Sequence, residues 1–223
     1  MCSRYNPPRW ETFYEDFRAL PPENLPVGPI FPRQPGIFVR AKEAEEREAV
    51  VGQFGLVPWF AKSLPLKYST FNARMETVPT AASFKDAWRR SQRCIVPAES
   101  FDEPCWETGR NVWWRFRRVD GHPWGLAGLW STWTDRATGE IVESYTIVTI
   151  NADAHPLMSR MHKPDPKLGP GEQDKRSVVA LERADFDTWL RGSLDDARAL
   201  LRLTPAEAFD AAEQDAAAGA GLF

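Results

Sequence analysis

The 223-residue chain is 43% hydrophobic and 26% charged, a balance that fits one globular domain with short appendages. No stretch approaches about 18 consecutive apolar residues, and the first residues lack an apolar core, so we expect neither a membrane span nor a signal peptide. The net charge of −3 confines any nucleic-acid surface to a local patch. Three cysteines without metal-like spacing favour a reducing cytoplasm, and ten tryptophans provide core residues and platforms for unstacked bases.

The first quarter of the chain combines one helical pattern with several extended ones. Aromatic residues at helical spacing predict a helix over 6–20. The prolines of 21–36 predict an extended loop. A strand is expected over 36–40, followed by a charged, solvated turn at 42–48. Residues 54–59 are interpreted as a short strand ended by proline.

Three polar residues alternate along the next predicted strand, at 71–78. Asn72, Arg74 and Glu76 would share one face of that strand. The pattern fits a functional site and equally a solvent-facing edge. A helix capped by Thr80 is expected to follow, with a basic outer face that we interpret as solvated.

The centre of the chain is typical of a strand meander. Four strand-like segments are separated by Thr-Gly or Asp-Gly turns. These segments are 94–101, 111–118, 124–133 and 141–151. A loop rich in His, Lys, Pro and Gly follows at 155–175.

The C-terminal part predicts one more strand and three helices. These are expected at 177–181, 184–191, 193–202 and from Thr204-Pro205 onward. The sequence therefore predicts an α+β domain over 1–205, in which flanking helices cover a curved, mainly antiparallel sheet with a barrel-like core. A C-terminal helix and a flexible Ala/Gly-rich tail are expected over 206–223.

Cys2 is the candidate nucleophile. If Met1 is removed, Cys2 carries a thiol and a free α-amine on the same residue. Their reference pKa values are about 8.5 and about 7.7–8.0, so both groups are partly deprotonated near neutral pH. Such an aminothiol condenses with an aldehyde and closes a five-membered thiazolidine ring.

Carboxylates and an amide supply candidates for acid–base work and orientation. Glu103 ends a predicted strand, where burial would raise its pKa, and Asp102 and Glu99 are its rivals. Asn72 suits orientation of a substrate or donation to an oxyanion.

Three histidines compete for the remaining role. His162 lies in the basic loop, and His155 and His122 are its rivals. A Cys, His, Asn and Glu set also describes a thiol hydrolase, so spacing leaves an amide and an aldehyde substrate both open.

Five sequence blocks, in order, resemble the SRAP family, the SOS-response-associated peptidase or abasic-site processing proteins. The resemblance covers roughly residues 1–190. The blocks are Met1-Cys2-Ser3-Arg4-Tyr5, Gly55-Leu56-Val57-Pro58-Trp59, Asn72-Ala73-Arg74-Met75-Glu76-Thr77, Arg93 to Glu103, and Gly128-Leu129-Trp130.

The chain departs from the family pattern in two places. An apparent insertion at 163–173 separates His162 from the block that resumes at Asp174-Lys175-Arg176-Ser177. Around Glu103, Ser100 and Asp102 replace the usual glycine and aromatic residue, and Pro104 replaces a tryptophan.

The resemblance implies a sensor that captures abasic sites in single-stranded DNA covalently. Cys2, after loss of Met1, would form a thiazolidine with the ring-opened deoxyribose and shield the lesion. Asn72 would position the sugar, Glu103 would shuttle protons and His162 would assist sugar opening. Strand-cleaving lyase activity is a further possibility of the same site. A self-processing cysteine peptidase and a non-covalent single-strand-binding module remain alternatives.

The resemblance also implies where DNA would lie. Arg4, Arg74 and Arg176 are expected to meet phosphates, and Pro58 and Trp59 to stack against bases. We expect a monomer without metal or cofactor whose partner is single-stranded DNA containing abasic sites, with no membrane association. The expected location is the cytoplasm, at the nucleoid when DNA is bound.

Overall fold

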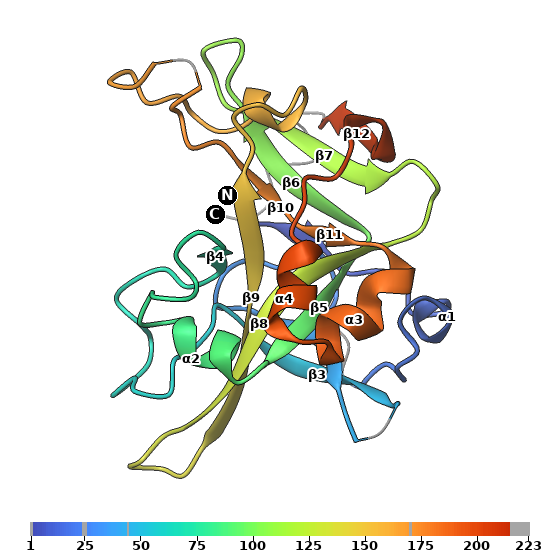
Figure 1. The fold of residues 1–223 in the computed structure, drawn as a ribbon, viewed down its shortest axis with the longest axis vertical. Helices are drawn as coiled ribbons and strands as arrows, with labels where there is room; N and C mark the ends of the chain where they lie inside the picture. The colour runs from blue at the N-terminus through green and yellow to red at the C-terminus, as the bar shows by residue number, and fades with distance from the viewer. Residues whose placement is uncertain (1, 24–25, 44, 170, 215–223) are drawn as a thin grey trace.

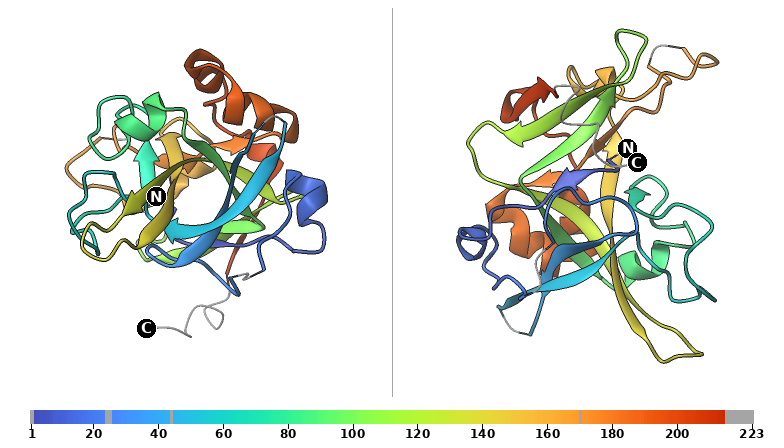
Figure 2. Two further views of the ribbon diagram at one scale, coloured as in Figure 1. Left: turned by 90° about the horizontal axis from the view of Figure 1, so that it is seen from below. Right: turned by 180° about the vertical axis from the view of Figure 1, so that it is seen from behind.

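Five strands pair edge to edge in a closed ring in the computed structural model, which describes residues 2–23, 26–43, 45–169 and 171–214 (Figures 1 and 2). Around the ring the order is β9, β3, β2, β5, β8 and again β9. Only the β3–β9 pair in this ring is parallel. The strands are β2 (Pro35–Ala41), β3 (Arg47–Phe54), β5 (Arg93–Ala98), β8 (Trp124–Thr134) and β9 (Ile141–Asn151).

Short strands extend the barrel along its two longest strands. On β9, β4 (Asn72–Arg74) pairs in parallel and β10 (Arg176–Val178) antiparallel. On β8, β11 (Ala180–Leu181) pairs antiparallel. The end of β4 and the segment before β10 are thereby brought to the C-terminal end of β9.

A second, antiparallel sheet continues from the barrel. Its order is β1 (Tyr5–Asn6), β6 (Ser100–Cys105), β7 (Val112–Arg118) and β12 (Phe209–Glu213). A single residue, Glu99, separates β5 from β6, so the chain passes almost directly from one sheet to the other. Strand β1 lies on the edge of this sheet and carries the N-terminal residues to the junction between the two sheets.

Alternation along the strands divides the core into two parts. On β2, Ile37 and Val39 belong to the cluster that packs against the helices, whereas Phe38 belongs to the other. That second cluster combines barrel residues with Phe101 of β6 and with Cys2. The helices are α1 (Phe13–Phe17), α2 (Lys85–Arg89), α3 (Phe186–Arg191) and α4 (Leu194–Ala199), with 3-10 turns η1 (Met158–Arg160), η2 (Arg183–Asp185) and η3 (Ala206–Ala208).

The α+β architecture with a barrel-like antiparallel core confirms the fold predicted from the sequence, and several element boundaries differ. The helix predicted over 6–20 is limited to α1, because Tyr5–Asn6 pairs with β6 and Arg18 adopts a left-handed conformation. The helix expected after Thr80 begins only at Lys85. Strand β3 covers part of the segment predicted as a solvated turn.

The predicted C-terminal helix is wrong for the described residues. Residues 206–208 form one 3-10 turn, and 209–213 pair with β7 as β12. Phe209 packs on Trp124 at a ring-centroid distance of 5.2 Å, so tertiary packing overrides the helix-start signal of Thr204-Pro205. The Ala/Gly-rich tail from 216 lies outside the described residues. Among the helices of the described part, none combines the length and apolar character required to cross a bilayer.

Candidate active site

Residues Cys2–Arg4 are held against the edge of the second sheet. Tyr5 is paired with Phe101, and the backbone N–H of Asp102 donates to the carbonyl of Arg4 at 3.0 Å. This register lays the N-terminal residues along β6, beside Glu103. The candidate nucleophile and the candidate proton carrier are therefore brought together by strand pairing between segments about a hundred residues apart.

The Asp102 carboxylate on β6 helps to hold the N-terminal residues in this position. Its fully buried carboxylate accepts hydrogen bonds from Arg115 at 2.9 and 3.1 Å and from the Gln214 amide at 2.8 Å. The Arg4 guanidinium forms an ion pair with the same carboxylate at 2.9 Å. A family position usually occupied by an aromatic residue thus holds a buried charge that fixes Arg4.

Cys2 is fully buried and its thiol is kept neutral. The Sγ atom donates to the carbonyl of Arg4 at 3.6 Å. Burial, and then the negative charge of Glu103, raise the pKa of the Cys2 thiol well above its ordinary value. Asn72, at the start of β4, donates from Nδ2 to the carbonyl oxygen of Cys2 at 2.7 Å. The amide therefore holds the backbone of the nucleophile, and its Oδ1 atom is buried with no partner among the described residues.

Glu103 and His162 form a carboxylate–imidazole pair. The distance from Oε2 to Nε2 is 2.8 Å, and Glu103 is almost completely buried. Burial alone acts to raise the pKa of Glu103, but nearby positive charge, including that of protonated His162, brings the pKa below its ordinary value. Such a pair can exchange a proton between its two members and pass it to a third group.

The backbone of His162 is fixed in an unusual conformation. Its φ is 63°, in the left-handed region, and its N–H donates to the carbonyl of Pro104 at 2.6 Å. The ammonium group of Lys175 donates to the carbonyls of Met161 and His162, both at 2.7 Å. Lys175 is buried, and burial lowers its pKa. Sequence reasoning missed Lys175, because no local pattern indicates a lysine that reaches back across an insertion.

The rival residues lie in other environments. His155 is buried, with Nε2 donating to the carbonyl of Thr204 at 2.8 Å and Nδ1 accepting from two backbone N–H groups. His122 is exposed beside Arg183 and the α1 helix. Asp102 is engaged by arginines as described above. The structure thus places Cys2, Asn72, Glu103 and His162 together.

The residues predicted to contact DNA differ in how exposed they are. Arg74 is exposed, whereas Arg176 is buried and donates to Glu76 at 2.8 and 3.1 Å. Trp59 is 57% exposed, but Pro58 is buried. Arg74 and Trp59 are therefore accessible from solvent, whereas Arg176 and Pro58 are not.

Six residues of the apparent insertion line a cavity of about 610 Å³: Pro164, Asp165, Pro166, Leu168, Gly171 and Gln173. His162, Lys175, Trp106 and Arg160 also line it. The ammonium group of Lys163 lies 5.1 Å from the ring centroid of Trp106. The described residues contain no group of three or more His, Cys, Asp or Glu side chains arranged to hold a metal ion.

These features place a candidate nucleophile, the Cys2 thiol, beside a carboxylate–imidazole pair at the junction of a small barrel and a second sheet. Residues 1–217 match the family described as SOS response associated peptidase (SRAP). The chain belongs to this family.

Named relatives agree with this assignment. The chain is 26% identical over 203 residues to "Abasic site processing protein HMCES" of Pongo abelii, covering 74% of this chain and 54% of the relative. It is 31% identical over 126 residues to "Abasic site processing protein YoqW" of Bacillus subtilis (strain 168), covering 55% of this chain and 54% of the relative. The chain spans about half the length of these curated relatives.

Two solved structures have the same fold, and one of them shares more sequence identity with the chain than these relatives do. A crystal structure of a protein from Bordetella bronchiseptica is 36% identical, with a TM-score of 0.86 over 96% of this chain and 100% of that chain. A structure from Bacteroides thetaiotaomicron, at 21% identity and a TM-score of 0.67 over 82% of this chain and 75% of that chain, supports the fold alone.

Proposed function

We propose that this protein processes abasic sites in single-stranded DNA by covalent capture through Cys2. The proposal rests chiefly on one observation: Cys2 lies beside the Glu103–His162 pair, with its backbone held by Asn72. The names of the relatives, abasic site processing proteins, point to the same substrate.

The chemistry needs an aldehyde, which a ring-opened abasic sugar supplies. After removal of Met1, the α-amine of Cys2 attacks the aldehyde carbon, and loss of one water molecule gives an imine. The thiol sulfur then adds to the imine carbon and the nitrogen takes up a proton, which closes the thiazolidine. One carbon–oxygen double bond is exchanged for a carbon–nitrogen and a carbon–sulfur bond, with no change of oxidation state.

The electrostatics favour this order of steps. Burial and Glu103 raise the pKa of the thiol, so the amine, with a reference pKa of about 7.7–8.0, is the first nucleophile available at neutral pH. Glu103 then receives the thiol proton as the sulfur attacks, and His162 relays protons to and from the sugar oxygen. A neutral thiol held next to a buried carboxylate suits a second step that follows imine formation.

The DNA strand is proposed to pass over Arg74 and Trp59. An exposed indole can stack against a base, and an exposed guanidinium can bind a phosphate. Each phosphate contact changes the slope of log affinity against log salt by roughly 0.7 for a single strand.

The test is capture of an oligonucleotide that carries one abasic site. Purified protein, with Met1 removal verified by intact mass, is expected to give an adduct that survives denaturing electrophoresis. Cys2→Ala should abolish the adduct. Cys94→Ala, which removes another fully buried thiol, is the matched control and should retain it. Failure of the processed wild-type protein to form the adduct would refute the proposal.

A further inference from the structure

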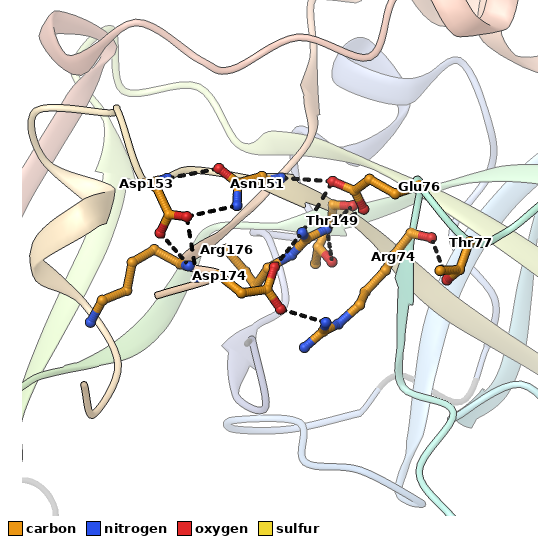
Figure 3. Close-up of polar contacts among 9 residues, drawn as sticks. Arg74, Glu76, Thr77, Thr149, Asn151, Asp153, Asp174 and Arg176 are labelled. Atoms are coloured by element: carbon orange, nitrogen blue, oxygen red, sulfur yellow. Dashed lines mark hydrogen bonds and ion pairs between the residues drawn. The ribbon is translucent and has the colours of Figure 1, made fainter. Parts of the chain in front are cut away.

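Four charged side chains of alternating sign meet beside the candidate active site (Figure 3). Arg74 and Glu76 come from β4 and the turn after it, and Asp174 and Arg176 come from the segment that follows the apparent insertion. Figure 3 shows the Asp174 carboxylate between the two guanidinium groups. The four formal charges sum to zero, so these arginines offer no net positive charge in the free protein.

The two arginines are held to different degrees. Arg176 is 3% exposed, donates twice to Glu76, and donates to the carbonyl of Thr149 at 2.8 Å and to Asp174 at 3.0 Å. The side chain of Arg74 is 46% exposed and is ion-paired with Asp174. Arg176 is thus fixed by several bonds, whereas among the described residues Asp174 is the one carboxylate ion-paired with Arg74.

The backbone around Asp174 is held by hydrogen bonds to Asp153. Asp174 has a φ of 51°, and its N–H donates to the Asp153 carboxylate at 3.2 Å, while the N–H of Lys175 donates to the same carboxylate at 2.8 Å. The Asp174 side chain itself is 38% exposed. A positive φ is uncommon for residues other than glycine, although Asp and Asn tolerate it. These bonds hold the backbone in a position from which the Asp174 carboxylate contacts both arginines. Solvent nevertheless reaches that carboxylate.

The location suits a phosphate next to the lesion. Asn72 and Arg74 are two residues apart in β4, so their side chains leave the same face of the strand about 7 Å apart. Carboxylate and phosphate oxygens both accept paired hydrogen bonds from guanidinium groups. A phosphate adjoining the captured sugar would consequently compete with Asp174 for Arg74.

We propose that Asp174 occupies a phosphate subsite formed by Arg74 and Arg176 and is displaced from Arg74 when single-stranded DNA binds. The Asp174 carboxylate thereby competes with a DNA phosphate for Arg74 and lowers the affinity of the protein for the DNA backbone. On binding, Arg74 exchanges this carboxylate for the phosphate. The inference rests on the proposed function, because it assumes that a nucleic-acid strand lies along this face.

The experiment measures affinity for an intact, labelled single-stranded oligonucleotide by fluorescence anisotropy over a series of salt concentrations. Asp174→Asn keeps the shape and tolerates the positive φ while removing the charge. Because an exposed ion pair contributes up to about 1 kcal/mol, the variant is expected to bind about two- to fivefold more tightly at low salt. Its log–log salt slope should steepen by roughly 0.7, because loss of the carboxylate leaves one more net positive charge on the face that meets the phosphate.

A matched control separates this local effect from net charge. Asp195→Asn removes a carboxylate ion-paired with Arg198 on α4, at 3.0 Å, and changes the total charge by the same amount. It should leave affinity and slope unchanged. Asp174→Gly, in which glycine also accommodates the positive φ, should reproduce the gain if Asp174→Asn folds poorly. Thermal melts verify that each variant is folded.

A double-mutant cycle assigns the effect to the proposed partner. Arg74→Gln should weaken binding, and combining it with Asp174→Asn should cancel the gain. The inference is overturned if the folded Asp174 variants bind no more tightly than wild type, or if their gain persists without Arg74. If wild type captures abasic DNA and these variants bind like wild type, this inference alone fails. If wild type neither binds nor captures DNA, the proposed function fails with it.

Discussion

Replacing Asp102 with asparagine tests whether a buried charge holds the N-terminal strand in place. The carboxylate is fully buried, forms two hydrogen bonds with Arg115, accepts one from Gln214 and is ion-paired with Arg4. Asparagine keeps the shape, but one of its two terminal groups is an amide donor that faces guanidinium donors. Asp102→Asn therefore removes the charge and mismatches at least one hydrogen bond.

The size of the effect follows from burial. Hydrogen bonds to charged groups contribute about 1.5–3 kcal/mol, and breaking one side of a buried ion pair costs about 3–5 kcal/mol. The side chains of Arg4 and Arg115 are 14% and 23% exposed, so both guanidinium groups can be partly rehydrated. We therefore expect the free energy of unfolding to fall by about 2–3 kcal/mol, which for a chain of this length lowers Tm by about 4–12 °C.

Urea titration and thermal melts measure this loss directly. Asp120→Asn is the matched control, because Asp120 forms an ion pair with Arg118 at 2.6 Å but its side chain is 41% exposed. The control should lose no more than about 1 kcal/mol. The reasoning is refuted if Asp102→Asn stays within about 0.5 kcal/mol of wild type, or if the control loses as much, because burial would then not set the cost.

Two further predictions concern proton transfer and pH. Glu103→Gln should slow adduct formation at least about 100-fold in single-turnover time courses, with affinity for an intact strand unchanged; an unchanged rate would remove Glu103 from the chemistry. Burial raises the pKa values of Cys94, Tyr5 and Tyr145 in the folded protein. The unfolded chain therefore loses these protons at a lower pH than the folded protein does. The urea midpoint should fall as the pH rises above about 8.5; a midpoint that stays constant from about pH 8.5 to about pH 11 would contradict this.

Much of the sheet could be predicted from the sequence because its signals are local. Gly109, Gly121 and Gly139 adopt positive φ at the turns where Thr-Gly or Asp-Gly pairs predicted them, and the strands between the turns follow the meander. Closure of the barrel depends on the parallel pairing of β3 with β9, and the second sheet is completed by the pairing of β12 with β7. Both pairings join segments that are distant in sequence. No local pattern encodes those pairings.

The candidate site shows the same contrast between local sequence signals and contacts of distant segments. The sequence blocks singled out Cys2, Asn72 and Glu103, and the structure brings their side chains together. Their partners come from distant segments, and although Asp174 and Lys175 stand in the block that resumes after the insertion, no local pattern shows which residues they contact. Lys175 reaches back over the insertion to the carbonyl of His162, and Asp174 lies against Arg74, a hundred residues earlier in the chain.

The acidic net charge of the chain is compatible with DNA capture because carboxylates already accompany the arginines of the site. Asp102 is fully buried, so the ion pair that it forms with Arg4 is part of the fold and fixes the position of Cys2. Asp174 is 38% exposed, so water and a phosphate can reach the ion pair that it forms with Arg74. Exposure of the carboxylate therefore decides which arginine is structural and which is free to exchange partners. Under the proposed function, only the second kind adds a positive charge to the DNA-binding face, and it does so when the strand binds.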